Sequence, residues 1–148
     1  MARFRYRMQN ILDVKEKLES QAKNEFAIAN AHLAEEEEKL NLLRARKASY
    51  EDELRHLYEK ALDVVEINRT QEAIDNLKER ILLQMENVKQ AQHNVDLARA
   101  KLTEAMQERK THDKLKERQF EEFLAEEAAK ESKEIDELVS FRHGQTEE

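Results

Sequence analysis

The sequence contains no proline, no cysteine and no tryptophan, and it has a single glycine, Gly144. Because proline and glycine are the residues that interrupt helices, nothing before His143 forces a helix to end. The absence of cysteine excludes disulfide bonds, cysteine zinc sites and thiol catalysis. Aromatic residues make up only 5% of the chain, too few for a thick, layered core. No run of about 18 apolar residues occurs, so direct membrane insertion is not expected.

Charged residues make up 40% of the 148 residues, and most of them are Glu, Lys or Arg. These side chains lose little rotamer freedom in a helix, and the composition is typical of long helices or coiled coils. The length suits one domain. The net charge of −7 predicts repulsion from nucleic acid, so nucleic acid is not an expected partner.

Apolar residues follow alternating three- and four-residue steps, the spacing of a coiled-coil seam. A first run is apolar at all but Glu36 and Lys47, and a second at all but Gln84. The first run is Phe26, Ala29, Leu33, Glu36, Leu40, Leu43, Lys47, Tyr50, Leu54, Leu57, Ala61 and Val64. The second is Ile74, Leu77, Ile81, Gln84, Val88, Ala91, Val95, Ala98, Leu102 and Ala105. Such a sustained period favours ordered helices over disorder.

The apolar pattern also extends backwards from the first run. Its positions there are Phe4, Met8, Ile11, Lys15, Leu18 and Ala22. The join from Leu18 through Ala22 to Phe26 has two consecutive four-residue steps, a stutter that would locally unwind a left-handed supercoil.

A turn is expected where β-branched residues interrupt the seam, between Asp63 and Thr70. Asn68 followed by Gln71 predicts a helix N-cap with a reciprocal partner, and Asp63 with Glu66 is a rival cap. The prediction is an all-α protein, a long antiparallel two-helix coiled coil. It forms one domain over residues 1–148, with helix one at about 4–64, a turn at 65–69, helix two at 70–140 and a frayed tail at 141–148. One continuous helix in a parallel dimer is the alternative, which would place Asn68 and Gln71 in its seam.

No arrangement of residues predicts an enzyme, a cofactor or a metal site. The histidines lack the spacing of a zinc motif, and a single glycine cannot build a phosphate-binding loop. Carboxylates abound, as in the run Glu35–Glu38, but a helical hairpin offers no cleft in which to desolvate them.

Both ends of the chain carry unusual charge patterns. Residues 3–7 alternate arginine with aromatic residues, which is compatible with solvated arginines beside a seam, or with binding to nucleic acid or a membrane surface. Residues 109–118 are rich in basic side chains, whereas residues 121–137 are strongly acidic. These charge-segregated ends would hold a partner or simply fray.

Three segments resemble one family. The opening run FRYRMQNILDVKEK at 4–17 resembles the start of the flagellar export protein FliJ family of Gram-positive-type bacteria. Residues 108–118 resemble that family's basic segment in the second helix, and residues 134–138 resemble its acidic end. Length and hairpin layout agree over essentially the whole chain.

The resemblance implies a non-enzymatic component of the flagellar type III export apparatus, similar to the central stalk of rotary ATPases. Its implied partners are the hexameric export ATPase, which receives the paired termini, the transmembrane export gate protein, and empty export chaperones. It implies a protein of the bacterial cytoplasm, associated with the inner face of the cell membrane at the flagellar base. We expect a monomer or weak dimer. An unrelated coiled-coil spacer or peripheral-stalk adaptor remains the alternative.

Antiparallel pairing would bring the N-terminus beside the basic part of the second helix. We therefore expect the ATPase-ring contact to comprise Arg3, Phe4, Arg5, Tyr6, Arg7, Arg118, Phe120 and Phe123. A second hypothesis places the export-gate contact on Ile74, Leu77 and Ile81, residues for which ordinary seam packing is the alternative.

Overall fold

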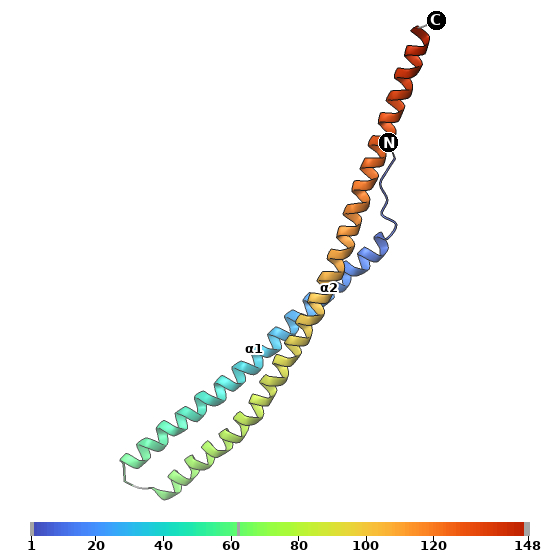
Figure 1. The fold of residues 1–148 in the computed structure, drawn as a ribbon. Coiled ribbons are helices and arrows are strands. Elements are labelled where there is room, and N and C mark those ends of the chain that lie inside the picture. Colours follow the sequence, from blue (N-terminus) through green and yellow to red (C-terminus); the bar gives the residue numbers. More distant parts are fainter. Residues whose placement is uncertain (1, 62, 147–148) are drawn as a thin grey trace. The chain divides into compact units, whose positions relative to one another are not determined.

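The computed structural model describes residues 2–61 and 63–146, and the described chain consists of two helices without strands. Helix α1 spans Gln9–Glu59 and helix α2 spans Val64–Thr146. A short connection at 60–63 reverses the chain, so that α1 and α2 form an antiparallel helical hairpin (Figure 1). The prediction of an all-α antiparallel coiled coil is confirmed, and one continuous helix is excluded.

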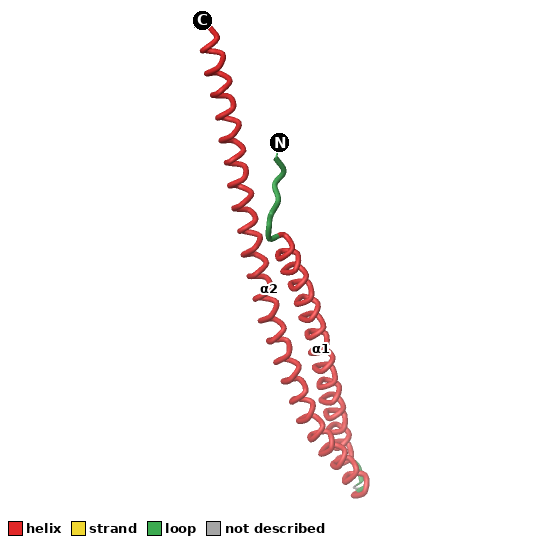
Figure 2. The backbone as a smooth tube through the Cα atoms, turned by 90° about the vertical axis from the view of Figure 1, so that its right-hand side faces the viewer, coloured by secondary structure: helices red, strands yellow, loops and turns green. Residues whose placement is uncertain are grey.

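Contacts divide the chain into two compact units. Unit 1 comprises residues 1–20 and 104–148, and unit 2 comprises residues 21–103. In unit 2, α1 and α2 lie side by side up to the connection (Figures 1 and 2). In unit 1, the start of α1 and the non-helical residues before it lie beside the second half of α2.

The seams that the sequence predicts form the interface between the helices. Every predicted position from Phe26 to Leu57 and from Ile74 to Ala105 is buried or half-buried. Val95, with 1% of its surface exposed, is among the most deeply buried side chains. Burial of these apolar faces is the main favourable contribution to helix pairing. The predicted positions Ala61 and Val64 are exposed, since Ala61 lies in the connection and Val64 is the first residue of α2.

The predicted stutter is wrong, because the three-four spacing continues without interruption to the start of α1. The inward positions there are Leu12, Lys15, Glu19 and Ala22. Leu12 is 2% exposed and Glu19 6%, whereas the predicted positions Ile11 and Leu18 are 43% and 44% exposed. The helix therefore keeps its supercoil register even though this register places charged residues in the interface.

The helix bounds also differ from those expected. Helix α1 begins at Gln9 rather than Phe4, and the chain turns at 60–63 rather than at 65–69. Asp63 caps α2: its Oδ1 accepts hydrogen bonds from the backbone N–H groups of Val65, at 3.1 Å, and Glu66, at 3.3 Å. Asn68 lies inside α2, so the N-cap is the rival that the sequence offered. Of the tail predicted to fray, residues 141–146 continue α2, and residues 147 and 148 lie outside the described residues.

Candidate partner-binding site

Residues 2–8 form a non-helical N-terminal arm, in which residues 2–6 lack regular structure and residues 7–8 form a turn. Phe4 is half-buried and Tyr6 is 7% exposed, whereas Arg3, Arg5 and Arg7 are exposed. The aromatic residues therefore face the protein and the arginines face solvent, so the arm displays three cations.

Phe4 attaches the arm to α2 through an aromatic cluster. Its ring centroid lies 5.2 Å from that of Phe120, in an edge-to-face arrangement, and 5.5 Å from that of Phe123. Such pairs contribute about 0.5–1.5 kcal/mol each beyond their burial. Among the predicted ring-contact residues, the structure thus brings Phe4, Phe120 and Phe123 together. Arg118 is exposed on α2, where it lines a shallow groove with Lys114 and Glu121.

The Tyr6 side chain contributes packing to the arm but no hydrogen bond within the described residues. Its hydroxyl oxygen is buried and has no partner among the described residues. A buried polar group left without a partner costs about 1–3 kcal/mol. The arm is therefore held by aromatic packing, part of which this unpaired hydroxyl offsets.

Ion pairs join α1 and α2 in unit 1, immediately after the arm. The Lys15 ammonium donates to Glu108 at 2.9 Å. The Arg109 guanidinium donates to the buried carboxylate of Glu19 and, at 2.7 Å, to Asp113 on its own helix. Hydrogen bonds to Glu19, and then to Asp113, raise the pKa of Arg109 above its ordinary value. Arg109 therefore remains protonated, and the interface in this unit is electrostatic rather than purely apolar.

The apolar pattern does not predict these pairs, because it runs through Ile11 and Leu18 and leaves out Glu19. A strict three-four count from Phe26 passes through Ala22, Glu19 and Lys15. This count predicts that Glu19 lies in the interface, and the same count along α2 places Arg109 on the opposing seam.

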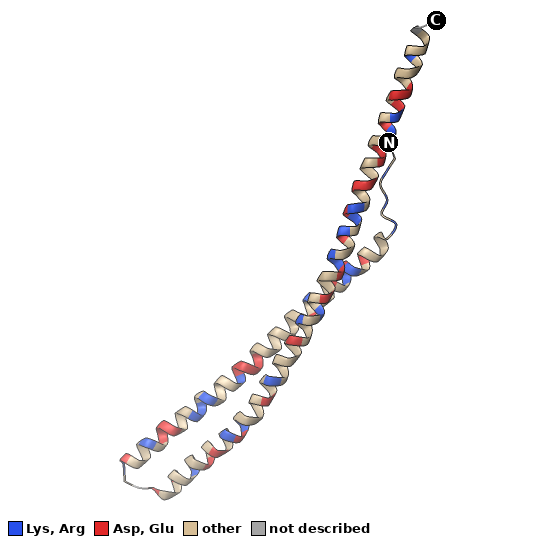
Figure 3. Ribbon diagram, viewed as in Figure 1, with Lys and Arg blue, Asp and Glu red and all other residues tan. Residues whose placement is uncertain are grey.

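Charge on α2 changes sign along its second half. Basic side chains gather at residues 109–118, and acidic ones predominate from Glu121 onwards (Figure 3). The three arginines of the arm belong to the same unit. Unit 1 therefore combines exposed cations, a small aromatic cluster and an acidic helical end, which suits recognition of charged protein surfaces.

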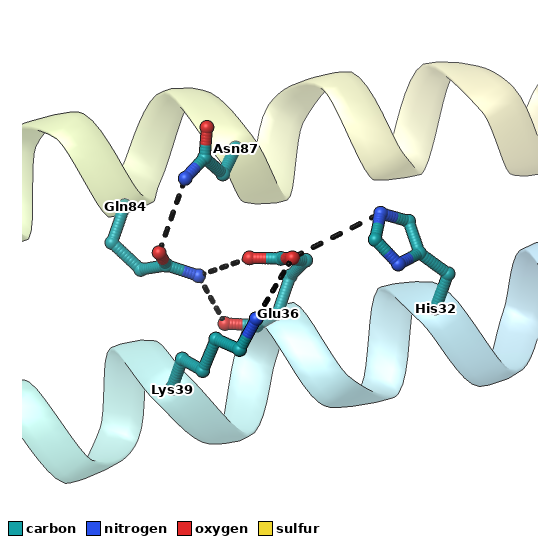
Figure 4. Close-up of polar contacts among 5 residues, drawn as sticks. All are labelled: His32, Glu36, Lys39, Gln84 and Asn87. Atoms are coloured by element: carbon teal, nitrogen blue, oxygen red, sulfur yellow. Dashed lines mark hydrogen bonds and ion pairs between the residues drawn. The ribbon is translucent and has the colours of Figure 1, made fainter.

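Unit 2 contains a buried polar layer within its mainly apolar seam. The Gln84 amide donates to the backbone oxygen of Glu36 at 2.9 Å and also to the Glu36 carboxylate (Figure 4). Asn87 donates to the Gln84 oxygen at 3.2 Å, and Lys39 and His32 lie 3.4 and 3.9 Å from the Glu36 carboxylate. Donation by Gln84 lowers the pKa of Glu36 most, against the effect of burial. This layer satisfies its polar groups across the interface, so its role is structural.

The residues of the predicted gate contact lie mainly in the interface between the helices. Ile74 is 6% exposed and Leu77 3%, and Ile81 is half-buried. Their burial supports the seam-packing alternative and leaves little of these side chains for a partner to touch. Leu82 and Leu83, next along α2, are 65% and 69% exposed.

The described residues contain neither a candidate metal site nor a candidate membrane-spanning helix. Over 2–61 and 63–146, no group of three or more His, Asp or Glu side chains is placed to hold a metal ion. The helices of this described part are also too polar for any of them to cross a membrane.

Comparison with known proteins decides the family. The family model described as Flagellar FliJ protein matches residues 4–148. The chain belongs to the FliJ family. A FliJ relative, the Flagellar FliJ protein of Bacillus subtilis (strain 168), is 26% identical over 135 residues, which cover 91% of this chain and 92% of that protein.

A solved structure shares the FliJ-family fold seen here. It is that of a Chlamydia trachomatis protein named as a YscO homolog, with a TM-score of 0.59 and 21% sequence identity. The match covers 98% of each chain. FliJ membership makes the present chain a component of flagellar type III protein export, in a family whose members are non-catalytic.

Proposed function

We propose that this FliJ-family chain is a non-enzymatic component that couples the hexameric export ATPase to the transmembrane export gate. In this account it also binds empty export chaperones, and it works in the bacterial cytoplasm at the inner face of the membrane below the flagellum. Family membership supports a role in export. The paired helices of each unit supply the stiffness that transmission of a mechanical change would require.

The arrangement of the N-terminal arm carries the proposal. Arg3, Arg5 and Arg7 are exposed on this non-helical segment, and Phe4 fixes the segment to α2. Arginine binds carboxylates through two parallel hydrogen bonds, so three exposed arginines suit an acidic surface. An acidic lining of the ATPase ring would be such a surface. The arm and the aromatic cluster together form the ring contact in this proposal.

The gate contact is a separate part of the proposal. A gate protein could engage Ile74 and Leu77 fully only where the helices separate, because both residues are buried. Ile81 is the most accessible of the three predicted residues. If it serves the gate, Ile81→Ala should weaken gate binding at temperatures where the variant is fully helical. A change in melting temperature alone, with gate binding intact, would assign Ile81 to the seam.

Charge reversal of the arm tests the ring contact. A variant with Arg3→Glu, Arg5→Glu and Arg7→Glu should keep wild-type helicity, because the arm is not helical and these side chains are exposed. It should lose binding to the purified export ATPase and stimulation of ATP hydrolysis. Binding of the wild-type chain to the ATPase should also weaken as the salt concentration is raised, since exposed charges are screened.

A matched control separates a specific contact from a general effect of charge. Arg44, Arg46 and Arg80 are exposed residues of unit 2, and their replacement by Glu changes the net charge equally, by six units from −7. This control variant should bind and stimulate like the wild type. Equal losses in both variants would reduce the effect to net charge, and unchanged activity of the arm variant would exclude the arm as the ring contact.

A further inference from the structure

The end of α2 is a helix whose apolar residues have no cover within the described chain. Every described side chain from Ala128 to Gln145 is exposed. Ile135, Leu138, Val139 and Phe141 are between 59% and 65% exposed. A cluster of large exposed apolar residues on one helical segment often marks an interaction surface.

These apolar residues have the spacing of a second coiled-coil seam. Starting one residue after Phe123, the alternating four- and three-residue steps give Leu124, Ala128, Glu131, Ile135, Leu138 and Arg142, which we call the tail seam. Continuing the first α2 seam beyond Phe123 instead gives Glu126, Lys130, Lys133 and Glu137, all charged. A shift of one residue rotates the face by about 100°, from 3.6 residues per turn. The tail seam therefore looks away from the face that pairs with α1.

Charge narrows the kind of partner that can cover this face. Residues 121–137 carry eight acidic side chains against two lysines, a net charge of −6. Glu127 and Glu134 flank the tail seam at the positions that set partner choice in coiled coils. A second copy of this helix would place glutamates opposite glutamates, and an anionic membrane surface would repel it. A basic helix would gain attraction along the flank that carries these glutamates.

Glu131 is a carboxylate within the tail seam and would need a cationic partner if a second helix covered it. The start of α1 shows such a pair. At the start of α1 the seam glutamate Glu19 is buried, and Arg109 from the opposing helix pairs with it. Glu131 occupies the equivalent kind of position in the tail seam. Burial without a cation would be costly, so a helix that covers the tail seam must bring a basic residue to this point.

We propose that the tail seam of α2 is a docking site for a basic, amphipathic helix of a partner protein, which pairs with it as a second two-helix coiled coil. Its apolar residues contact Ile135 and Leu138, and an arginine or lysine pairs with Glu131. This site is separate from the arginines of the arm. Because α2 already holds the tail in helical form, binding does not have to nucleate a helix on this side, which lowers its entropic cost.

Two synthetic peptides with the same apolar heptads test the proposal on the full chain. One carries Lys on its flanks and Arg at the position facing Glu131, and the other carries Glu at all these positions. We expect the basic peptide alone to bind, as measured by fluorescence anisotropy. The double change Ile135→Ala and Leu138→Ala should weaken its binding by about tenfold or more, the loss typical of central interface residues. Leu82→Ala with Leu83→Ala, equally exposed elsewhere on α2, is the control and should bind normally.

A charge exchange makes the pairing at Glu131 testable on its own. Glu131→Lys should lose binding to the basic peptide and regain it when the facing arginine of that peptide is replaced by Glu. Equal binding of the two original peptides, or no effect of the Ile135 and Leu138 changes, would overturn the proposal. Sedimentation of the wild type and of the Ile135→Ala, Leu138→Ala variant gives another test. If the wild type is a dimer and the variant is a monomer, a second copy of the chain covers the tail seam, and the proposal of a basic partner is refuted.

Discussion

The side-chain amide of Gln84 donates to both the backbone oxygen and the carboxylate of Glu36, across the interface between α1 and α2. This contact keeps a carboxylate ionised in a place where burial alone would favour its neutral form. The Gln84 hydrogen bond lowers the pKa of Glu36, helped by Lys39 and His32. The polar layer is thus tolerated because each of its groups has a partner.

Replacement of Gln84 by Leu should destabilise the hairpin at neutral pH. The Glu36 carboxylate would remain buried without its main donor, and such a group costs more than the hydrogen bond contributed. A folded pKa below the ordinary 4.5 means that the contribution is present above that pH and is lost as pH falls through the lowered value. The difference in melting temperature between Gln84→Leu and wild type should therefore shrink below about pH 4.5.

The double variant Glu36→Leu with Gln84→Leu is the control for this effect. Replacing both partners by apolar residues of similar size is often neutral or stabilising. We expect its melting temperature at pH 7 to exceed that of Gln84→Leu. A double variant less stable than the single one would show that the polar layer contributes more than mutual satisfaction of its groups.

Substitutions of neighbouring residues test the register at the start of α1. Leu12→Ala should cost about 2 kcal/mol or more, because it removes a side chain that is 2% exposed. Ile11→Ala should change stability by less than about 0.5 kcal/mol, since Ile11 is 43% exposed. Urea denaturation followed by circular dichroism measures both. If Ile11→Ala lost more stability than Leu12→Ala, the buried face would instead run through Ile11 and Leu18.

Most of the fold could be predicted because the spacing of apolar residues in unit 2 is regular. From Phe26 to Leu57 the period alone identifies the buried face, even at Glu36 and Lys47. The prediction failed near Leu18 because an apolar side chain was preferred to a strict count. Glu19 occupies the interface since Arg109 pairs with it, and a single helix pattern does not reveal a partner ninety residues away.

The candidate site could be predicted in composition but not in conformation. Proximity of Phe4 to Phe120 and Phe123 followed from antiparallel pairing. The non-helical arm did not, because Phe4 and Met8 also fit a helical spacing. Alternation of arginine and aromatic residues, with a period of two rather than that of a helix, was the signal for a non-helical segment. Contact of this site with an ATPase stays a prediction.

The connection between the helices offers a further test. Asp63→Ala should destabilise the protein by about 1 kcal/mol, because it removes the acceptor for two backbone N–H groups at the start of α2. Asn68→Ala is the matched control, and its effect should be small because Asn68 is exposed within the helix. Thermal melting measures the stability of both variants. A larger loss of stability for Asn68→Ala than for Asp63→Ala would indicate that α2 begins after Asn68.

Contact between the arm and the export ATPase is the central claim, and site-specific photo-crosslinking measures it most directly. A photoreactive amino acid at Arg5, introduced in cells that assemble flagella, should crosslink the chain to the ATPase. The same group at the exposed Arg46 of unit 2 should not. Crosslinks to the ATPase from position 46 and none from position 5 would contradict the account.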